Sequence, residues 1–144
     1  MNTVRPINDR YGRPDEETTG HLRAGLDFLN AFRSVEPNMP LSYALGFMHV
    51  ALDPGYGTVH YARAMAMHQP VTSRILLEIG QKTRTGGPGL GLVDSVYDTV
   101  DLRLKRYFLT PKGKLLVQAI VKEMSRRRMG EVIPLRSGKD VDQR

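Results

Sequence analysis

Hydrophobic side chains recur at helical spacing in the first third of the chain. The first set places three leucines and a phenylalanine on one helical face: Leu22, Leu26, Leu29 and Phe32. We expect this helix to begin near Thr18 or Thr19, either of which can cap it, and to end before Pro37. A second helix begins at Leu41 and ends at the turn residues 53–55. Because it is apolar on two neighbouring faces, we expect it to be central in the fold.

Residues 61–74 have the pattern of two short helices with a tight corner between them. One side of the first helix carries Tyr61, Ala62 and Met65. Thr58 can cap this helix, and Ala66 stands at the corner in place of the usual glycine. We expect Met67 to be buried directly after the corner.

The second of these helices begins with polar side chains, ahead of an apolar side. The polar residues and a proline are Gln69, Pro70, Thr72, Ser73 and Arg74. Pro70 suits a first turn because its missing N–H needs no partner there. Hydroxyl, amide and guanidinium groups bond to phosphates and base edges, so the pattern predicts a recognition helix in a helix-turn-helix. The alternative is an ordinary helical corner in which Ser and Thr only cap the helix.

Two runs with β-strand composition follow, over residues 90–97 and 102–109, and they predict a hairpin. The second run carries three cations near the tip: Arg103, Lys105 and Arg106. A charge run is most often a solvated face. A basic hairpin directly after a candidate recognition helix is, however, typical of the wing of a winged helix.

A loop precedes this hairpin and a helix follows it. Residues 81–89 are rich in glycine and predict a flexible basic loop with Lys82 and Arg84 exposed. Thr110 is expected to cap a helix that begins at Pro111. The apolar face of this helix contains Leu116, Ile120 and Met124. That face needs a partner, either the body of the domain or a second copy of the chain.

The 144 residues predict a flexible arm over residues 1–17, one domain over 18–126 and a flexible basic and polar tail over 127–144. The net charge of +6 favours an anionic partner, most commonly nucleic acid. The absence of cysteine excludes disulfides and Cys-ligated zinc. There is no apolar signal segment or membrane-spanning run. We therefore expect a cytoplasmic protein without a membrane partner, which is nucleoid-associated when bound to DNA.

The residues give little support for catalysis. None of the four histidines has metal-binding spacing, and Ser73 lacks the nucleophile-elbow context that a triad with His68 and Asp101 would need. The glycines of residues 86–91 follow a helix and lack the Lys-Ser/Thr pair of a phosphate-binding loop. We predict a protein that is not an enzyme and has no cofactor or metal, with a hydrolase that depends on His68 as the alternative. The tyrosines fit a core or its rim better than an effector pocket.

Three blocks of sequence occur in the order found in one known family. They are the helix-turn-helix at 61–74, a first wing strand at 91–93, and residues 101–113, with an Asp-x-Arg wing tip and a Leu-Thr-x-x-Gly helix opening. Together they resemble the MarR family of winged-helix transcription regulators, over roughly residues 20 to 125. The last block is the most specific of the three.

The resemblance implies a mainly α-helical winged helix-turn-helix with a small β-hairpin, dimerising through its N- and C-terminal helices. It implies a recognition helix in the major groove of double-stranded DNA. It also implies that Arg103, at the wing tip, reaches the adjacent minor groove and that Asp101 orients this tip. Members of the family are homodimers, and many bind a small acidic effector between the dimer and DNA-binding parts.

The sequence thus predicts a sequence-specific DNA-binding transcription regulator that acts as a repressor. The alternative is a winged-helix protein-interaction module without sequence-specific DNA binding. Candidate DNA-binding residues are Gln69, Pro70, Thr72, Ser73, Arg74, Lys82, Arg84, Asp101, Arg103 and Lys105. Residues 81–89 depart from the family pattern, because they add roughly eight residues before the wing. They either extend the recognition helix or form a second loop that grips the DNA backbone.

Overall fold

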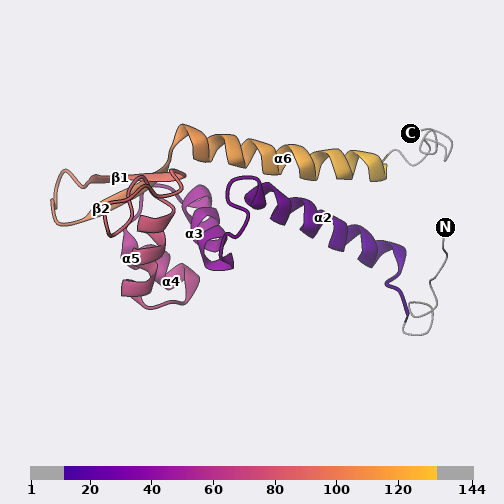
Figure 1. Ribbon diagram of the computed structural model, residues 1–144, viewed down its shortest axis with the longest axis horizontal. Helices are drawn as coiled ribbons and strands as arrows, with labels where there is room; N and C mark the ends of the chain where they lie inside the picture. Colours follow the sequence, from indigo (N-terminus) through magenta and orange to yellow (C-terminus); the bar gives the residue numbers. More distant parts are fainter. Residues whose placement is uncertain (1–11, 133–144) are drawn as a thin grey trace.

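The computed structural model describes residues 12–132, with side chains described as far as residue 125. Two long helices, α2 (Glu16–Arg33) and α6 (Pro111–Val132), lie side by side and form an arm (Figure 1). The remaining elements form a compact head at one end of this arm. They are α3 (Leu41–Leu52), α4 (Thr58–Met65), α5 (Gln69–Glu78), β1 (Val93–Tyr97) and β2 (Lys105–Leu109).

The core of the head forms where α3 meets the other elements. Phe47 and Val50 of α3 are fully buried and belong to the same apolar cluster as Leu76 of α5. The predicted central position of α3 is confirmed for this side of the helix. Its other side is open to solvent, with Leu45 exposed to 42% and Leu52 to 72%. Of the two apolar faces of α3, one therefore lies in the core and the other is exposed.

The start of α2 differs from the prediction because Asp15 caps this helix. Its carboxylate accepts the Thr18 N–H at 2.7 Å, and this hydrogen bond lowers the pKa of Asp15 below its usual value. The helix begins at Glu16, so the prediction of a cap at Thr18 or Thr19 is wrong, and residues 16 and 17 belong to the helix.

Helices α4 and α5 form the predicted helix-turn-helix. Gly57 precedes the first helical residue of α4 without a side-chain cap, so the predicted cap by Thr58 is wrong. Ala66 forms the corner in the left-handed conformation, with φ of +55°, and the Met67 N–H donates to the Ala62 carbonyl at 3.0 Å. Met67 is only partly buried, contrary to prediction.

The wing is a two-stranded antiparallel sheet. Its register runs from Val93 opposite Leu109 to Tyr97 opposite Lys105. Each strand begins three residues later than its predicted run, which shortens β1 at the base of the hairpin and β2 at the tip. As a result Arg103 lies in the connecting turn, and its predicted place in the second strand is wrong.

Backbone hydrogen bonds attach the wing to the helices on both sides. The Gly55 N–H donates to the Tyr107 carbonyl at 2.7 Å, and the Tyr107 N–H donates to the Tyr56 carbonyl at 3.0 Å. At the other end of β2, the Thr110 hydroxyl accepts the Gly113 N–H at 3.0 Å and caps α6, as predicted. The wing is therefore fixed to the connection between α3 and α4 as well as to the start of α6.

Helix α6 extends six residues beyond the predicted end of the domain at residue 126, as far as Val132. The rest of the predicted tail and most of the predicted arm lie outside the described residues. No helix within the described part of the chain has the length and apolar character needed to cross a membrane.

Candidate nucleic-acid interface

Helix α5 has one face in the core and one face in solvent. The core face carries Thr72, Ile75 and Leu76. Thr72 is fully buried, and its hydroxyl donates to the His68 carbonyl at 3.2 Å. The prediction that Thr72 contacts DNA is therefore wrong, since the side chain belongs to the interior of the helix-turn-helix. The other four predicted contact residues of this helix have accessible side chains: Gln69, Pro70, Ser73 and Arg74.

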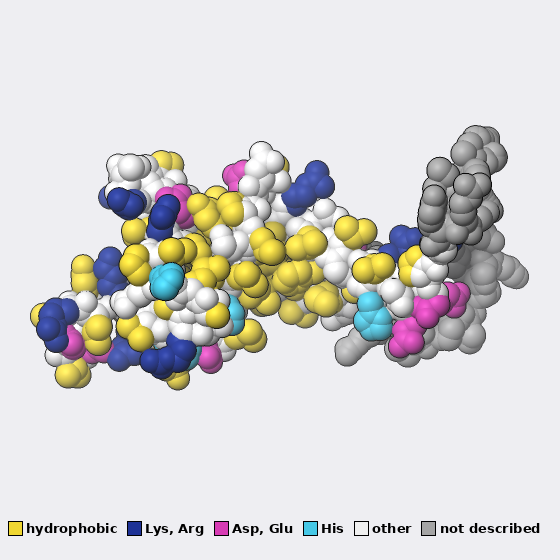
Figure 2. Space-filling model, turned by 90° about the horizontal axis from the view of Figure 1, so that it is seen from below, with side chains coloured by type: hydrophobic (Ala, Val, Ile, Leu, Met, Phe, Trp, Pro, Cys, Tyr) yellow, Lys and Arg dark blue, Asp and Glu magenta, His cyan; other side chains and the backbone are white. Residues whose placement is uncertain are grey.

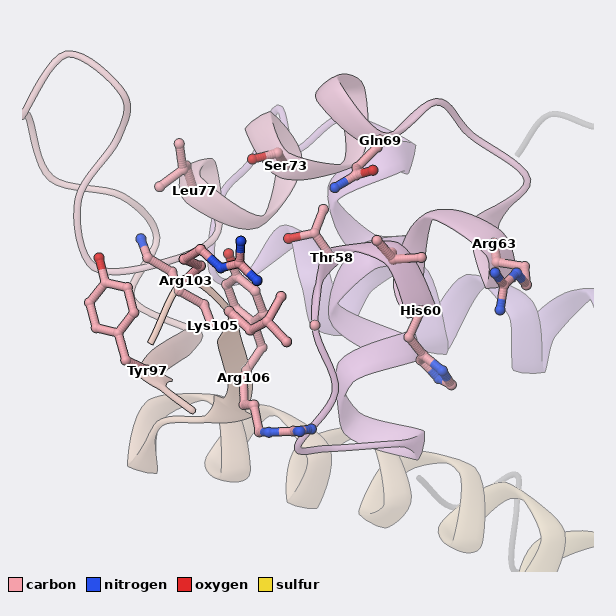
Figure 3. Close-up of a pocket in the computed structure, with 14 residues that line it drawn as sticks. Thr58, His60, Arg63, Gln69, Ser73, Leu77, Tyr97, Arg103, Lys105 and Arg106 are labelled. Carbon is pink, nitrogen blue, oxygen red and sulfur yellow. The ribbon is translucent and has the colours of Figure 1, made fainter. Parts of the chain in front are cut away.

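The exposed face of α5 and the wing border one concave hollow of about 640 Å³. Gln69, Ser73 and Leu77 line it from α5 at intervals of four residues, which places them on one helical face. Arg103 and Lys105 line it from the wing. Figure 3 shows Gln69 and Ser73 on one side of the hollow and the labelled wing side chains on the other. The structure thus brings together the two predicted contact regions, while Arg74 is exposed and does not line the hollow.

The wing tip is held in shape by a side-chain pair between Asp101 and Arg103. Two nitrogens of the Arg103 guanidinium donate to the Asp101 carboxylate at 3.0 and 3.1 Å, and the Arg103 N–H donates to it at 3.0 Å. These bonds lower the pKa of Asp101 and raise that of Arg103, so both groups are charged near neutrality. The Arg103 side chain remains 88% exposed. This fits the predicted orienting contact by Asp101.

Arg106 is engaged within the protein. Its guanidinium donates to the Asp98 carboxylate at 2.7 Å and to the Gly55 carbonyl at 2.9 Å. Asp98 also accepts the Val100 N–H at 2.7 Å, and these bonds hold the pKa of Asp98 below its usual value. All three cations predicted near the tip line the hollow, and two of them, Arg103 and Arg106, are also paired with a carboxylate of the wing turn.

Residues 81–89 form a loop that is closed by its own backbone hydrogen bonds. The Thr83 N–H donates to the Gly87 carbonyl at 2.7 Å, and residues 82 and 88 form a β-bridge. The Leu90 N–H donates to the Glu78 carbonyl at 3.0 Å, which binds the base of the loop to the end of α5. Because α5 ends at Glu78, the added residues do not lengthen the recognition helix.

The two cations of this loop are exposed, as predicted. Lys82 also lines a second hollow, of about 240 Å³, together with Lys105 and Leu77. The loop base, the end of α5 and the wing therefore meet around one depression next to the larger hollow. Arg84, nearer the tip of the loop, lines neither hollow.

Sequence reasoning missed several residues that line the larger hollow. From α4 these include Thr58, His60 and Arg63, and from the wing they include Tyr97. His60 is held in place by Asp53, at 3.2 Å, and its ring stacks on another ring, that of Tyr56. The three-residue spacing of His60 and Arg63 on one side of α4 is a signal that would have identified them. Among the described residues, no three His, Cys, Asp or Glu side chains are grouped to hold a metal.

A helix-turn-helix followed by an attached β-hairpin defines the class of winged-helix proteins. Comparison with protein-family models gives no match, and comparison with curated protein sequences gives none either. Solved structures, however, share the whole arrangement. A transcriptional repressor, CouR, bound to a 23-mer DNA duplex is similar at a TM-score of 0.53 and 18% identity, over 99% of this chain and 93% of that one.

Two further structures have the same architecture. A MepR mutant of S. aureus bound to an oligodeoxyribonucleotide has a TM-score of 0.56 at 18% identity, over 91% of each chain. A protein described as a MarR family transcription regulator has a TM-score of 0.51 at 19% identity, over 89% of this chain and 83% of that one. The fold is therefore that of the MarR-family regulators. The predicted fold class of helices with a winged hairpin and the predicted resemblance are confirmed.

Proposed function

We propose that the protein is a sequence-specific DNA-binding transcription regulator that acts as a homodimer. One observation carries this proposal: Ser73 on the exposed face of α5 and Arg103 at the wing tip line the same hollow. A helix and a hairpin that face the same way can contact adjacent grooves of one duplex. Two such surfaces pointing apart would have no common ligand.

In the proposed complex, α5 enters the major groove. Gln69 and Ser73 offer an amide and a hydroxyl to base edges, and Pro70 allows close approach of the first turn. Arg74 can bond to a guanine through two nitrogens, which is the commonest base-specific contact. Arg103 reaches the minor groove, where negative potential attracts a guanidinium. Lys105 contacts the backbone beside it.

The 81–89 loop adds a second set of phosphate contacts through Lys82 and Arg84. Both side chains are exposed, and the loop is fixed to the end of α5 by backbone hydrogen bonds. Contacts of this kind position a protein on DNA without reading sequence. They also make binding depend on salt, because every neutralised phosphate releases counterions.

The regulator would bind a near-palindrome with half-sites about 10 bp apart, since each copy presents one α5. Repression is the direction we infer, because a structural neighbour, CouR, is described as a repressor on DNA. We infer that the regulator acts in the cytoplasm, on the nucleoid.

The first test separates base reading from backbone contact. A specific duplex is first selected with the purified protein, and binding to it and to random duplex is titrated over a range of salt. Arg74→Ala should reduce the ratio of specific to random affinity by roughly 10-fold or more, the value of one bidentate base contact. Lys82→Ala and Arg84→Ala should weaken both affinities alike and make the salt slope shallower by about 1 each.

Lys122→Ala serves as the control, because Lys122 is an exposed cation on α6 that lines neither hollow. It should leave both affinities unchanged. An unchanged specificity ratio for Arg74→Ala would count against base reading by this helix. A protein that ignores duplex DNA at moderate salt but captures a protein partner would support the interaction-module alternative.

A further inference from the structure

The turn that joins β1 to β2 exposes branched apolar side chains. Val100 is 92% exposed, Leu102 70% and Leu104 48%. Turns of this kind usually carry Gly, Asn, Asp or Ser, which need no shelter from water. Isolated exposed apolar residues need no explanation, but three at alternate positions of one projecting turn form a feature of the surface.

Hydrogen bonds within this turn hold its backbone, although the turn projects into solvent. The Asp98 N–H donates to the Leu104 carbonyl at 2.8 Å, and the Leu104 N–H donates to the Asp101 carbonyl at 2.9 Å. The Asp98 carboxylate accepts two further backbone N–H groups, from residues 100 and 101. The apolar side chains are therefore held outward by the structure, and little conformational entropy would be lost if a ligand covered them.

Charge and position indicate what covers this apolar tip (Val100, Leu102 and Leu104). Each acidic group of the turn is paired with an arginine, Asp98 with Arg106 and Asp101 with Arg103, so Lys105 at the start of β2 supplies the excess positive charge. Arg103 lies between two members of the apolar tip, and its side chain is 88% exposed in spite of this pairing. Leu104 itself lines the hollow that α5 borders. A duplex seated against α5 would thus meet the exposed Arg103 guanidinium with apolar side chains on either side of it.

We propose that the apolar tip is a wedge that enters the minor groove and partly unstacks one base step, so that the protein bends its DNA. Side chains such as Leu and Phe act in this way in architectural DNA-binding proteins, where they kink the duplex. The cost of unstacking is lowest at flexible pyrimidine–purine steps such as TA and CA/TG. The operator should therefore carry such a step under each wing. This inference rests on the DNA-binding function proposed above.

The test measures DNA bending by energy transfer between dyes at the two ends of a selected duplex. Val100→Thr keeps the shape of the side chain and makes it polar, and Leu102→Gln does the same for the longer residue. The full-length protein should bend the duplex by at least about 20°. The double variant that combines Val100→Thr with Leu102→Gln should lose most of this bend. Its affinity for a duplex with a TA step under the wing should fall roughly three- to tenfold.

Val96→Thr is the matched control, because Val96 is 53% exposed in the same wing but lies on the opposite strand face from Tyr97 and lines neither hollow. It should bend DNA as the unmodified protein does. Replacing the TA step by a stiff AA step should weaken the unmodified protein more than the double variant. Intact specific binding with an unbent duplex, or with equal bends for all variants, would overturn the wedge and leave the regulator proposal in place. Absence of any DNA binding would overturn both.

Discussion

Asp98 fixes the conformation of the wing tip through a single carboxylate. The side chain is 10% exposed and accepts hydrogen bonds from Val100, Asp101 and Arg106. Each donor favours the charged form, which explains why the pKa of this group is lowered. The stability of the wing should therefore depend on the protonation of one residue.

We predict a pH dependence that follows from this pKa. Because the pKa of Asp98 is lower in the folded than in the unfolded protein, its contribution is present above the ordinary Asp value near 4 and is lost as pH falls through the folded value. Asp98→Asn keeps an acceptor for the backbone but removes the charge. Urea unfolding midpoints measured between about pH 6 and pH 2.5 should fall less steeply for this variant than for the unmodified protein.

Asp94→Asn is the control for this series, since Asp94 is exposed on the same hairpin. It should reproduce the slope of the unmodified protein. Parallel profiles for Asp98→Asn and the unmodified protein would mean that Asp98 gains nothing from its partners on folding.

Two neighbouring residues of α5 show how far the sequence alone can assign a side chain to the core or to the surface. Ser73 borders the hollow, whereas Thr72, one position earlier, is buried. Residues 72, 75, 76 and 79 have the i, i+3, i+4, i+7 spacing of a core face, so the helical period favours the interior for Thr72. The error came from treating every hydroxyl as a ligand group, although a threonine can satisfy its hydroxyl on the carbonyl four residues earlier.

At the scale of elements, Thr110 joins the start of α6 to the base of the wing. Its side chain is nearly buried, accepts the Gly113 N–H at 3.0 Å and donates to the Gly91 carbonyl at 2.6 Å. An added Cβ at Gly113 would lie 2.2 Å from the Leu92 carbonyl oxygen, so the helix approaches this segment closely. The helix cap at Thr110 and the close approach of Gly113 to Leu92 together set the position of α6.

We predict that Thr110→Val destabilises the protein by about 2 kcal/mol, because it removes a helix cap and leaves a buried N–H without its acceptor. Thr110→Ser retains the hydroxyl, so its loss in free energy of unfolding should be less than about half of that value. Free energies from urea unfolding provide the comparison. Thr99→Val, at an exposed position of the wing turn, should change stability by less than about 0.5 kcal/mol. Equal losses for the Val and Ser variants at residue 110 would show that the hydroxyl is unimportant.

Some elements were predictable because their signals are local. The Thr-Pro pair located the start of α6 correctly, since both residues act within one turn. Three possible caps lie within five residues near the start of α2, and only the structure shows that Asp15 is used. The 81–89 loop is closed by backbone hydrogen bonds, which glycine and threonine content does not reveal.

At the scale of the whole molecule, apolar side chains remain exposed along the arm. Leu22 is 58% exposed, Leu26 57% and Leu29 48%. Figure 2 shows hydrophobic side chains gathered over a broad area of one face of the molecule. The pairing of α2 with α6 inside one chain therefore leaves part of the predicted apolar stripe uncovered, although Phe32 is buried.

We predict that a second copy covers this stripe and that Leu26→Glu prevents the association, because it would bury a charge in an apolar interface. Light scattering after size exclusion should give a dimer for the unmodified protein and a monomer for the variant. The thermal midpoint of the unmodified protein should rise with concentration, whereas that of the variant should not. Leu52→Glu, at the exposed end of α3, should stay dimeric. A concentration-independent monomer in the unmodified protein would contradict the proposal.

The attachment of the wing restricts how this fold can be altered by exchange of parts. Tyr107 shares backbone hydrogen bonds with Gly55 and Tyr56, and Arg106 reaches the Gly55 carbonyl from the same strand. A hairpin transplanted from another protein would have to supply both sets of bonds or leave polar groups of the α3–α4 connection without partners. Changes in recognition by the wing are therefore easier to obtain by substitution within its turn than by replacement of the whole hairpin.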